Sequence, residues 1–299
     1  MSLVIKKTVL LIILPWLLLS AVHAAITVTD SEGSHFSLPQ PAQRIISLAP
    51  HMTELLFAVG AGDRLIGTVE HSDYPKRAQS VPRVGNHQAL DLEAILALKP
   101  DLVLAWPAGG SIPGLEKLKD LGIPVYASPS GGLANIATLL RTLGSLAGMS
   151  WRGEEVASHY ERLLSELRLQ YAHRPKVRVF LQIWDKPLMT VNGQHYINDV
   201  ITTCGGTNIF AELPGIAPTV GLEAVISRAP EVIIVNDQGP QSRQWLSAWK
   251  TWKQIPAVAD DYLYEIQAHK IVRQTPRILM GVKKMCSILD EVRQGRKGK

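Results

Sequence analysis

The sequence predicts an α/β fold in which two similar Rossmann-like lobes are joined by one long backbone α-helix, with a cleft between the lobes. Three observations predict it. Short β-branched runs alternate with longer amphipathic stretches, one helix–strand segment recurs in the second half, and a long stretch between the halves has helical periodicity.

Five short apolar runs rich in β-branched residues predict strands. They are Arg44–Leu48, Asp101–Ala105, Pro124–Ala127, Val177–Ile183 and Glu231–Val235. Amphipathic stretches separate them, and such alternation is typical of mostly parallel sheets covered by helices. Pro100 and Pro230 precede two of the runs. Because the residue before a proline is pushed out of helical geometry, these prolines mark sharp helix-to-strand connections.

A repeat relates the two halves. The segment Leu92–Leu104, LEAILALKPDLVL, is matched 130 positions later by Leu222–Ile234, LEAVISRAPEVII. The Leu, Glu, Ala and Pro positions are identical and the remaining apolar positions are mostly conserved in character. A repeat of this kind indicates an internal duplication, so we expect Glu93 and Glu223 at equivalent places in the two lobes.

The stretch 150–174 predicts one long helix between the lobes. Its apolar residues recur at spacings of three and four: Val156, Tyr160, Leu163, Leu164, Leu167 and Tyr171. Ser150 is expected to cap its start, and Pro175 to stop it. About 23 residues would span roughly 34 Å. Because one stiff helix bends less readily than loop crossovers, we expect a largely pre-formed cleft with modest hinge motion.

The N-terminal segment 1–24 predicts a secretory signal peptide. Lys6 and Lys7 precede the apolar run Val9–Leu19, and Val22-His23-Ala24 supplies a small-residue end. An uncleaved anchor is the alternative, but the run is shorter than the roughly 20 residues a span needs. No cysteine stands near the cleavage site to carry a lipid. We therefore expect a soluble periplasmic protein, with an N-terminal lobe at 25–131, a linking helical segment at 132–175 and a C-terminal lobe at 176–299.

The net charge and the two cysteines further limit the class of protein to which the chain can belong. Without Lys6 and Lys7 the formal charge falls from +5 to +3, with acidic and basic residues interspersed, which is not a nucleic-acid footprint. The only cysteines are Cys204 and Cys286, and an oxidising compartment favours a disulfide between them. Two free thiols are the alternative. A zinc site is disfavoured because neither cysteine has a second ligand at the usual spacing.

An exported hydrolase is a less favoured interpretation. The chain has no Gly-x-Ser-x-Gly nucleophile elbow, no His-Glu-x-x-His and no Gly-Lys-Ser/Thr phosphate loop. Gly60-Ala61-Gly62 follows an amphipathic stretch instead of a strand, so it indicates the end of a helix. An adhesive protein would explain export but not duplicated lobes. We expect no catalytic residues, no metal site and no cofactor of the protein's own.

Several segments carry a resemblance to a known family. They are RIISLAPHMTE at 44–54, SDYP at 72–75, LDLE at 90–93, LKPDLVLAW at 98–106, CGGTNIF at 204–210 and TPR at 275–277. The chain resembles the periplasmic binding proteins of the helical-backbone class, those for cobalamin and ferric siderophores, from about Arg44 to Leu289. Among these, it is most similar to the cobalamin receptors. The resemblance implies capture of cobalamin or a related corrinoid for an ABC importer. A ferric siderophore or haem is the alternative ligand.

The resemblance also implies an aromatic-lined ligand cleft between the lobes. Tyr74 and Trp106 match aromatic ligand-contacting positions, and aromatic faces suit a flat macrocycle. His87 stands where a tryptophan is expected, Ala217 replaces another, and His269-Lys270 replace Asp-Trp. Trp184 lies one position from an expected phenylalanine and could supply a compensating face. Alternatively, these aromatic residues serve ordinary packing.

Four histidines, His51, His71, His87 and His269, fall in segments that would border this cleft. A neutral imidazole can ligate cobalt or iron, although single histidines on loops are more often hydrogen-bonded surface residues. The resemblance further implies that Glu93 and Glu223 dock onto a membrane permease dimer, which works with its ATPase subunits. The alternative role of each glutamate is to stabilise a helix N-terminus. We expect a monomer that binds a small molecule.

Overall fold

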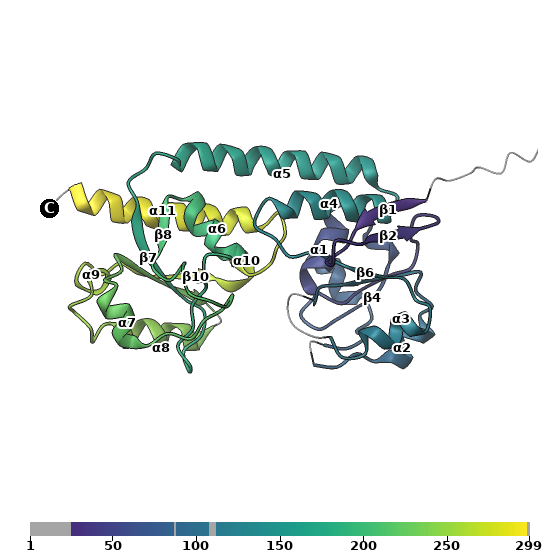
Figure 1. The fold of residues 1–299 in the computed structure, drawn as a ribbon, viewed down its shortest axis with the longest axis horizontal. Helices are drawn as coiled ribbons and strands as arrows, with labels where there is room; N and C mark the ends of the chain where they lie inside the picture. The colour runs from purple at the N-terminus through teal and green to yellow at the C-terminus, as the bar shows by residue number, and fades with distance from the viewer. Residues whose placement is uncertain (1–24, 87, 108–111, 238, 298–299) are drawn as a thin grey trace, which may run out of the picture.

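The computed structural model describes residues 25–86, 88–107, 112–237 and 239–297. It contains two four-stranded parallel sheets, each covered by helices on both faces, and the helix α5 (Ser150–Tyr171) runs along one side past both of them (Figure 1). The predicted fold class is confirmed. The domain ranges given above stay predictions, and the predicted signal peptide at 1–24 lies outside the described residues.

The N-terminal sheet has the strand order β4-β3-β5-β6. Its strands are β3 (Ile45–Ser47), β4 (Leu65–Thr68), β5 (Leu102–Ala105) and β6 (Val125–Ala127). The strands β1 (Ile26–Thr29) and β2 (His35–Leu38) form a separate antiparallel pair. The helices are α1 (Pro50–Ala58), α2 (Leu92–Ala97) and α3 (Leu115–Asp120), with 3₁₀ turns at Gly62–Arg64 and Lys76–Ser80.

The C-terminal sheet repeats this topology with the order β10-β9-β7-β8. Its strands are β7 (Val177–Gln182), β8 (Gly206–Asn208), β9 (Val232–Asp237) and β10 (Leu263–Gln267). The helices of this half are α6 (Tyr196–Thr203), α7 (Leu222–Ser227), α8 (Pro240–Trp249), α9 (Pro256–Ala259), α10 (Ala268–Ile271) and α11 (Ile278–Lys297). In both lobes the first strand of the sheet lies between the second and the third.

The repeat extends to hydrogen bonds. In the first lobe the Asp101 carboxylate accepts from the backbone N–H of Arg44, whose guanidinium donates to the carbonyls of Leu98 and Lys99. In the second lobe the Glu231 carboxylate accepts from the backbone N–H of Arg178, which donates to the carbonyls of Arg228 and Ala229. Lys99 and Ala229, 130 positions apart, both have positive φ, 48° and 42°. The same junction is therefore built twice.

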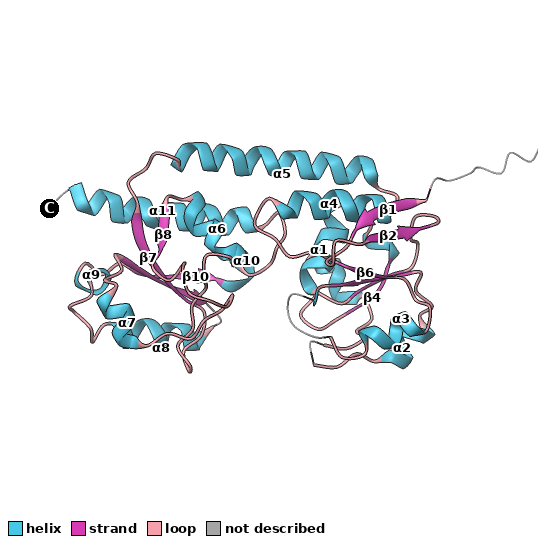
Figure 2. Ribbon diagram, viewed as in Figure 1, coloured by secondary structure: helices cyan, strands magenta, loops and turns pink. Residues whose placement is uncertain are grey.

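The helix α5 joins the lobes through a continuous core. It packs on α4 (Asn135–Leu146), and a Cβ on Gly153 would lie only 2.8 Å from the carbonyl oxygen of Leu140. Glycine therefore permits the close approach of the two helices. The core that includes Leu140 and Leu164 continues to Leu289 on α11. Figure 2 shows α4 and α11 beneath α5, one over each half of the molecule.

The structure tests two predictions made above, the disulfide between Cys204 and Cys286 and the helix cap at Ser150. The disulfide Cys204–Cys286 is confirmed, and it ties the end of α6 to α11. The predicted cap at Ser150 is wrong. The helix begins at Ser150 itself, the capping position is Met149, and no side chain caps it. Met149 N–H instead donates to the carbonyl of Gly144, in the last turn of α4.

No helix in the described ranges is both long enough and apolar enough to cross a bilayer.

Candidate ligand-binding site

The carboxyl ends of the strands in the two sheets face each other, as cross-lobe contacts of the segments that follow them show. Glu54 lies in α1, directly after β3, and Asp73 in the loop after β4. Both carboxylates meet Arg273, which follows β10 and α10 in the other lobe. Open α/β sheets bind ligands outside the carboxyl ends of their strands. The junction between the lobes is therefore the candidate site.

Glu54 is the buried centre of a cross-lobe ion cluster. Its side chain is 2% exposed, and it accepts from Arg273 Nη1 at 2.7 Å and from Arg277 Nη2 and Nε at 2.8 and 2.9 Å. Arg273 also donates to Asp73 at 2.6 Å and to the carbonyl of His71 at 2.9 Å. Burial raises the pKa of Asp73, but hydrogen bonding to Arg273 and its positive charge outweigh burial, so this pKa is lowered. This cross-lobe cluster holds the two lobes in a defined relation.

Tyr74 lies beside this cluster, with the Arg277 guanidinium 3.7 Å from the centre of its ring. The side chain is 45% exposed and lines a cavity of about 340 Å³. Phe57, Arg152 and Val156 line the same cavity, so it extends towards α5. One face of the Tyr74 ring is thus covered by Arg277.

Trp106 and His51 form a second aromatic feature at the carboxyl ends of β5 and β3. Their rings pack edge to face, with centroids 5.0 Å apart. Trp106 Nε1 and His51 Nε2 are both buried without a hydrogen-bond partner among the described residues. Burial, with the positive charge of Arg273 as a smaller cause, lowers the pKa of His51 to about 4. The imidazole is therefore neutral at neutral pH, and the buried Trp106 N–H has no acceptor among the described residues.

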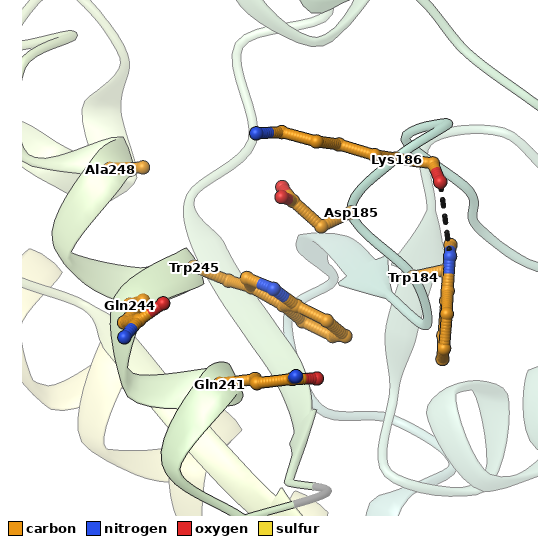
Figure 3. A pocket seen from close by; sticks show the side chains of 7 residues that line it. All are labelled: Trp184, Asp185, Lys186, Gln241, Gln244, Trp245 and Ala248. Carbon is orange, nitrogen blue, oxygen red and sulfur yellow. Dashed lines mark hydrogen bonds between the residues drawn. The ribbon is translucent and has the colours of Figure 1, made fainter.

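Trp184 projects from the loop after β7 and packs against Trp245 of α8, with ring centroids 6.0 Å apart (Figure 3). It is 44% exposed and lines a cavity of about 470 Å³ in the C-terminal lobe. His269 is an exposed residue of α10. Its pKa is lowered by burial and, to a smaller extent, by the positive charges of Arg277, Lys270 and Arg273. The arginines of the ion cluster therefore act on His269.

The structure does not gather all predicted ligand residues into one pocket. Tyr74 and Trp184 line different cavities, and Trp106 packs on His51. His87 lies outside the described residues. His71 is exposed, with a positive φ of 64°, and contributes its carbonyl to Arg273. Within the described ranges, no three His, Cys, Asp or Glu side chains come together to hold a metal ion.

Sequence reasoning missed three residues of this region: Glu54, Arg273 and Trp245. Glu54 belongs to the segment 44–54 quoted above, so the signal was present but no role was drawn from it. Arg273 pairs with a residue 219 positions away, which no local pattern reveals. Trp245 lies on an ordinary amphipathic helix and carries no sequence signal of its own.

Two duplicated α/β lobes whose strand ends face each other, joined by one backbone helix, define a class of bilobal solute receptors. The family model "Periplasmic binding protein" matches residues 45–269. The chain belongs to this family.

The relatives at higher identity share one description. The chain is 38% identical to the "Vitamin B12-binding protein" of Vibrio parahaemolyticus over 86% of its length and 93% of the relative's. The solved structure of the periplasmic vitamin B12 binding protein BtuF of Vibrio cholerae is 38% identical. The match has a TM-score of 0.78 and covers 85% of this chain and 98% of the Vibrio cholerae protein. The haem-binding protein RhuT of Roseiflexus shares the fold. It is 22% identical, with a TM-score of 0.74, and the match covers 84% of this chain and 99% of RhuT.

Proposed function

We propose that this chain is the periplasmic vitamin B12-binding component of an ABC importer. The observation that carries the proposal is the 38% identity and TM-score of 0.78 to the B12-binding protein of Vibrio cholerae over nearly its whole length. The haem-binding and siderophore-system neighbours are under 25% identical, so they bear on fold alone. The protein acts as a carrier that binds and releases its ligand without chemical change.

The aromatic residues Tyr74, Trp106 and Trp184 are proposed to contact the ligand, together with His87 and His269. Aromatic side chains offer large apolar area at low entropy cost, which suits the face of a corrin. The cluster of Glu54, Asp73, Arg273 and Arg277 has balanced charge. Balanced charge suits a large ligand that is itself close to neutral and rich in amides. The cobalt stays with the ligand, as cargo.

Delivery to the membrane is proposed to use Glu93 and Glu223. Each is exposed and lies in the first turn of its helix, α2 or α7. Both helices lie on the side of the molecule away from α5 (Figure 1). Among the described residues, neither carboxylate forms an ion pair, so both are available for charge-assisted contacts with arginine. A duplicated pair of acidic side chains matches a permease dimer with two-fold symmetry.

The function is tested by isothermal titration calorimetry on the chain beginning at residue 25. Cyanocobalamin, a ferric hydroxamate siderophore and haem are titrated separately. We expect one-to-one binding of cyanocobalamin and no saturable heat with the other two. Heat with haem or the siderophore but with no corrinoid would overturn the proposal in favour of that ligand.

A further inference from the structure

The loop that carries Tyr74, residues 70–75 after β4, is held by both lobes at once. The first lobe holds it at Ser72, a residue that is 1% exposed. The Ser72 hydroxyl accepts from Thr68 Oγ1 at 2.9 Å, and its carbonyl accepts from Arg83 Nη2 at 3.0 Å. This buried point of the loop is therefore fixed by hydrogen bonds within the lobe to which the loop belongs.

The exposed residues on either side of that point are held by Arg273 of the second lobe. Arg273 Nη2 donates to the His71 carbonyl at 2.9 Å, and Nη1 donates to the Asp73 carboxylate at 2.6 Å. The same Nη1 donates to Glu54 at 2.7 Å. Within the first lobe, Gln79 adds one hydrogen bond to the Asp73 carbonyl at 3.2 Å. Because one planar guanidinium joins three acceptors, the outer part of the loop follows the position of Arg273.

The Tyr74 ring is oriented by the second arginine of the same lobe. The Arg277 guanidinium lies 3.7 Å from the centre of the ring, in a cation–π contact. Arg277 is itself fixed, because its Nε and Nη2 donate to the buried Glu54 carboxylate at 2.9 and 2.8 Å. The Tyr74 side chain stays 45% exposed, so a large part of it is accessible to a ligand.

The two arginines are fixed to the second lobe as one unit. Both lie in the short segment between α10 and α11, and Arg277 directly precedes α11. The residues at its two ends, Ile271 and Ile278, are fully buried in the core that continues along α11. Tyr74 therefore belongs to the first lobe by sequence but takes its orientation from the second.

We propose that Arg273 and Arg277 are positioning residues for ligand binding: they hold the Tyr74 loop from the other lobe and act on the ligand through this ring. The role rests on the proposed function. Binding groups reach a defined geometry when neighbouring hydrogen bonds lock them, which lowers the cost of ordering them on binding. Separation of the lobes would remove both arginines from the loop together, while Ser72 stays in place. The presentation of Tyr74 thus depends on how the lobes are placed.

The first test needs no ligand. The chain from residue 25 is labelled with 3-fluorotyrosine, and the fluorine NMR line of Tyr74 is identified as the one that Tyr74→Phe lacks. In Arg277→Gln we expect this line to shift towards its position in the denatured protein. The lines of the buried Tyr126 and Tyr160 should stay, which a general loss of structure would not allow. A Tyr74 line that does not move would overturn the positioning role.

The second test is a double-mutant cycle, in which cyanocobalamin binding is measured by calorimetry. Arg277→Gln should weaken binding about tenfold in the otherwise unaltered protein, but less than about twofold in Tyr74→Ala, where no ring remains to be positioned. Equal losses in the two backgrounds would show that Arg277 does not act through Tyr74. Arg162→Gln, which removes a 59% exposed arginine of α5, should leave the affinity unchanged.

A milder variant covers the case in which Arg277→Gln does not fold. Arg277→Lys keeps a positive charge beside Glu54 but lacks the planar guanidinium, so it should shift the Tyr74 line less and weaken binding about threefold. A protein that binds cyanocobalamin but whose Tyr74 line is the same in both variants would overturn the positioning role alone. An unaltered protein that binds no corrinoid would overturn the proposed function, and with it the role in ligand binding.

Discussion

At the scale of single residues, Trp106 and His51 stand out because their packed rings each hold a buried nitrogen without a hydrogen-bond partner among the described residues. The two rings pack edge to face, and the nitrogens concerned are Trp106 Nε1 and His51 Nε2. An unsatisfied buried donor costs about 1–3 kcal/mol, and the Trp106 N–H carries this cost in the ligand-free protein.

We predict that Trp106→Ala weakens cyanocobalamin binding by about 2 kcal/mol, or roughly 30-fold, because an aromatic anchor is lost. Calorimetry measures the change. Trp151→Ala, at the exposed position on α5, should bind as the unaltered protein does. An unchanged dissociation constant in Trp106→Ala would remove this residue from the site.

The depressed pKa of His51 predicts acid sensitivity. The folded state holds the imidazole neutral, with a pKa of about 4 against 6.5 in the unfolded chain. Its contribution is therefore fully present above pH 6.5 and is lost as the pH falls towards 4. Chemical denaturation between these pH values should show a steeper loss in the unaltered protein than in His51→Phe, by up to roughly 3 kcal/mol. His173→Phe, at an exposed position, should keep the full slope.

At the scale of elements, the sequence patterns recovered the strands whose apolar runs are buried on both faces. Val177–Gln182 and Val232–Asp237 are the two adjacent central strands of their sheet, and their β-branched runs are visible without a structure. Of the four edge strands, β6 was predicted from its apolar run, whereas β4, β8 and β10 were not. The strand β8, Gly206-Thr207-Asn208, pairs on one side only and has no strand-like composition of its own. Its conformation is imposed by β7, so local sequence could not reveal it.

The helices α2 and α7 carry the docking prediction. Changing both Glu93 and Glu223 to alanine should leave ligand affinity and folding nearly intact, since both side chains are exposed. In the reconstituted transporter it should abolish ligand-stimulated ATP hydrolysis. The matched control changes Glu155 and Glu166 of α5, on the opposite side of the molecule, and should retain stimulation. Unchanged stimulation in the Glu93/Glu223 variant would rule out the docking role.

The disulfide makes a separate prediction for α6 and α11. It closes a loop between residues 82 positions apart. In the chain-entropy model such a loop restricts the unfolded chain by roughly 4–5 kcal/mol. Changing Cys204 and Cys286 together to alanine should lower the free energy of unfolding by an amount of this order, measured by urea denaturation. A loss below about 1 kcal/mol would show that the disulfide contributes little.

At the scale of the whole molecule, the cross-lobe cluster and the continuous core set how far the lobes can move. Glu54 in the first lobe receives three charge-assisted hydrogen bonds from two arginines of the second. The two-lobe architecture could be predicted from the sequence repeat and the helical periodicity, but the contact between Glu54 and the two arginines could not. It joins residues more than 200 positions apart and exists only once the lobes are placed.

Glu54→Gln should therefore destabilise the protein by about 3 kcal/mol, because it leaves two partly buried guanidinium groups without their carboxylate. Urea denaturation measures the loss. Glu116→Gln removes a carboxylate that is 80% exposed and should cost under about 1 kcal/mol. Equal stability of the two variants would show that the cluster does not hold the lobes together.

The capture of vitamin B12 by this chain is measured directly by one competition experiment. The chain from residue 25 is mixed with equimolar cyanocobalamin, haem and a ferric siderophore, and then separated by gel filtration. We expect the protein peak to carry the visible spectrum of cyanocobalamin at one equivalent. A protein peak with the absorption of haem or of the siderophore, and without that of cyanocobalamin, would contradict it.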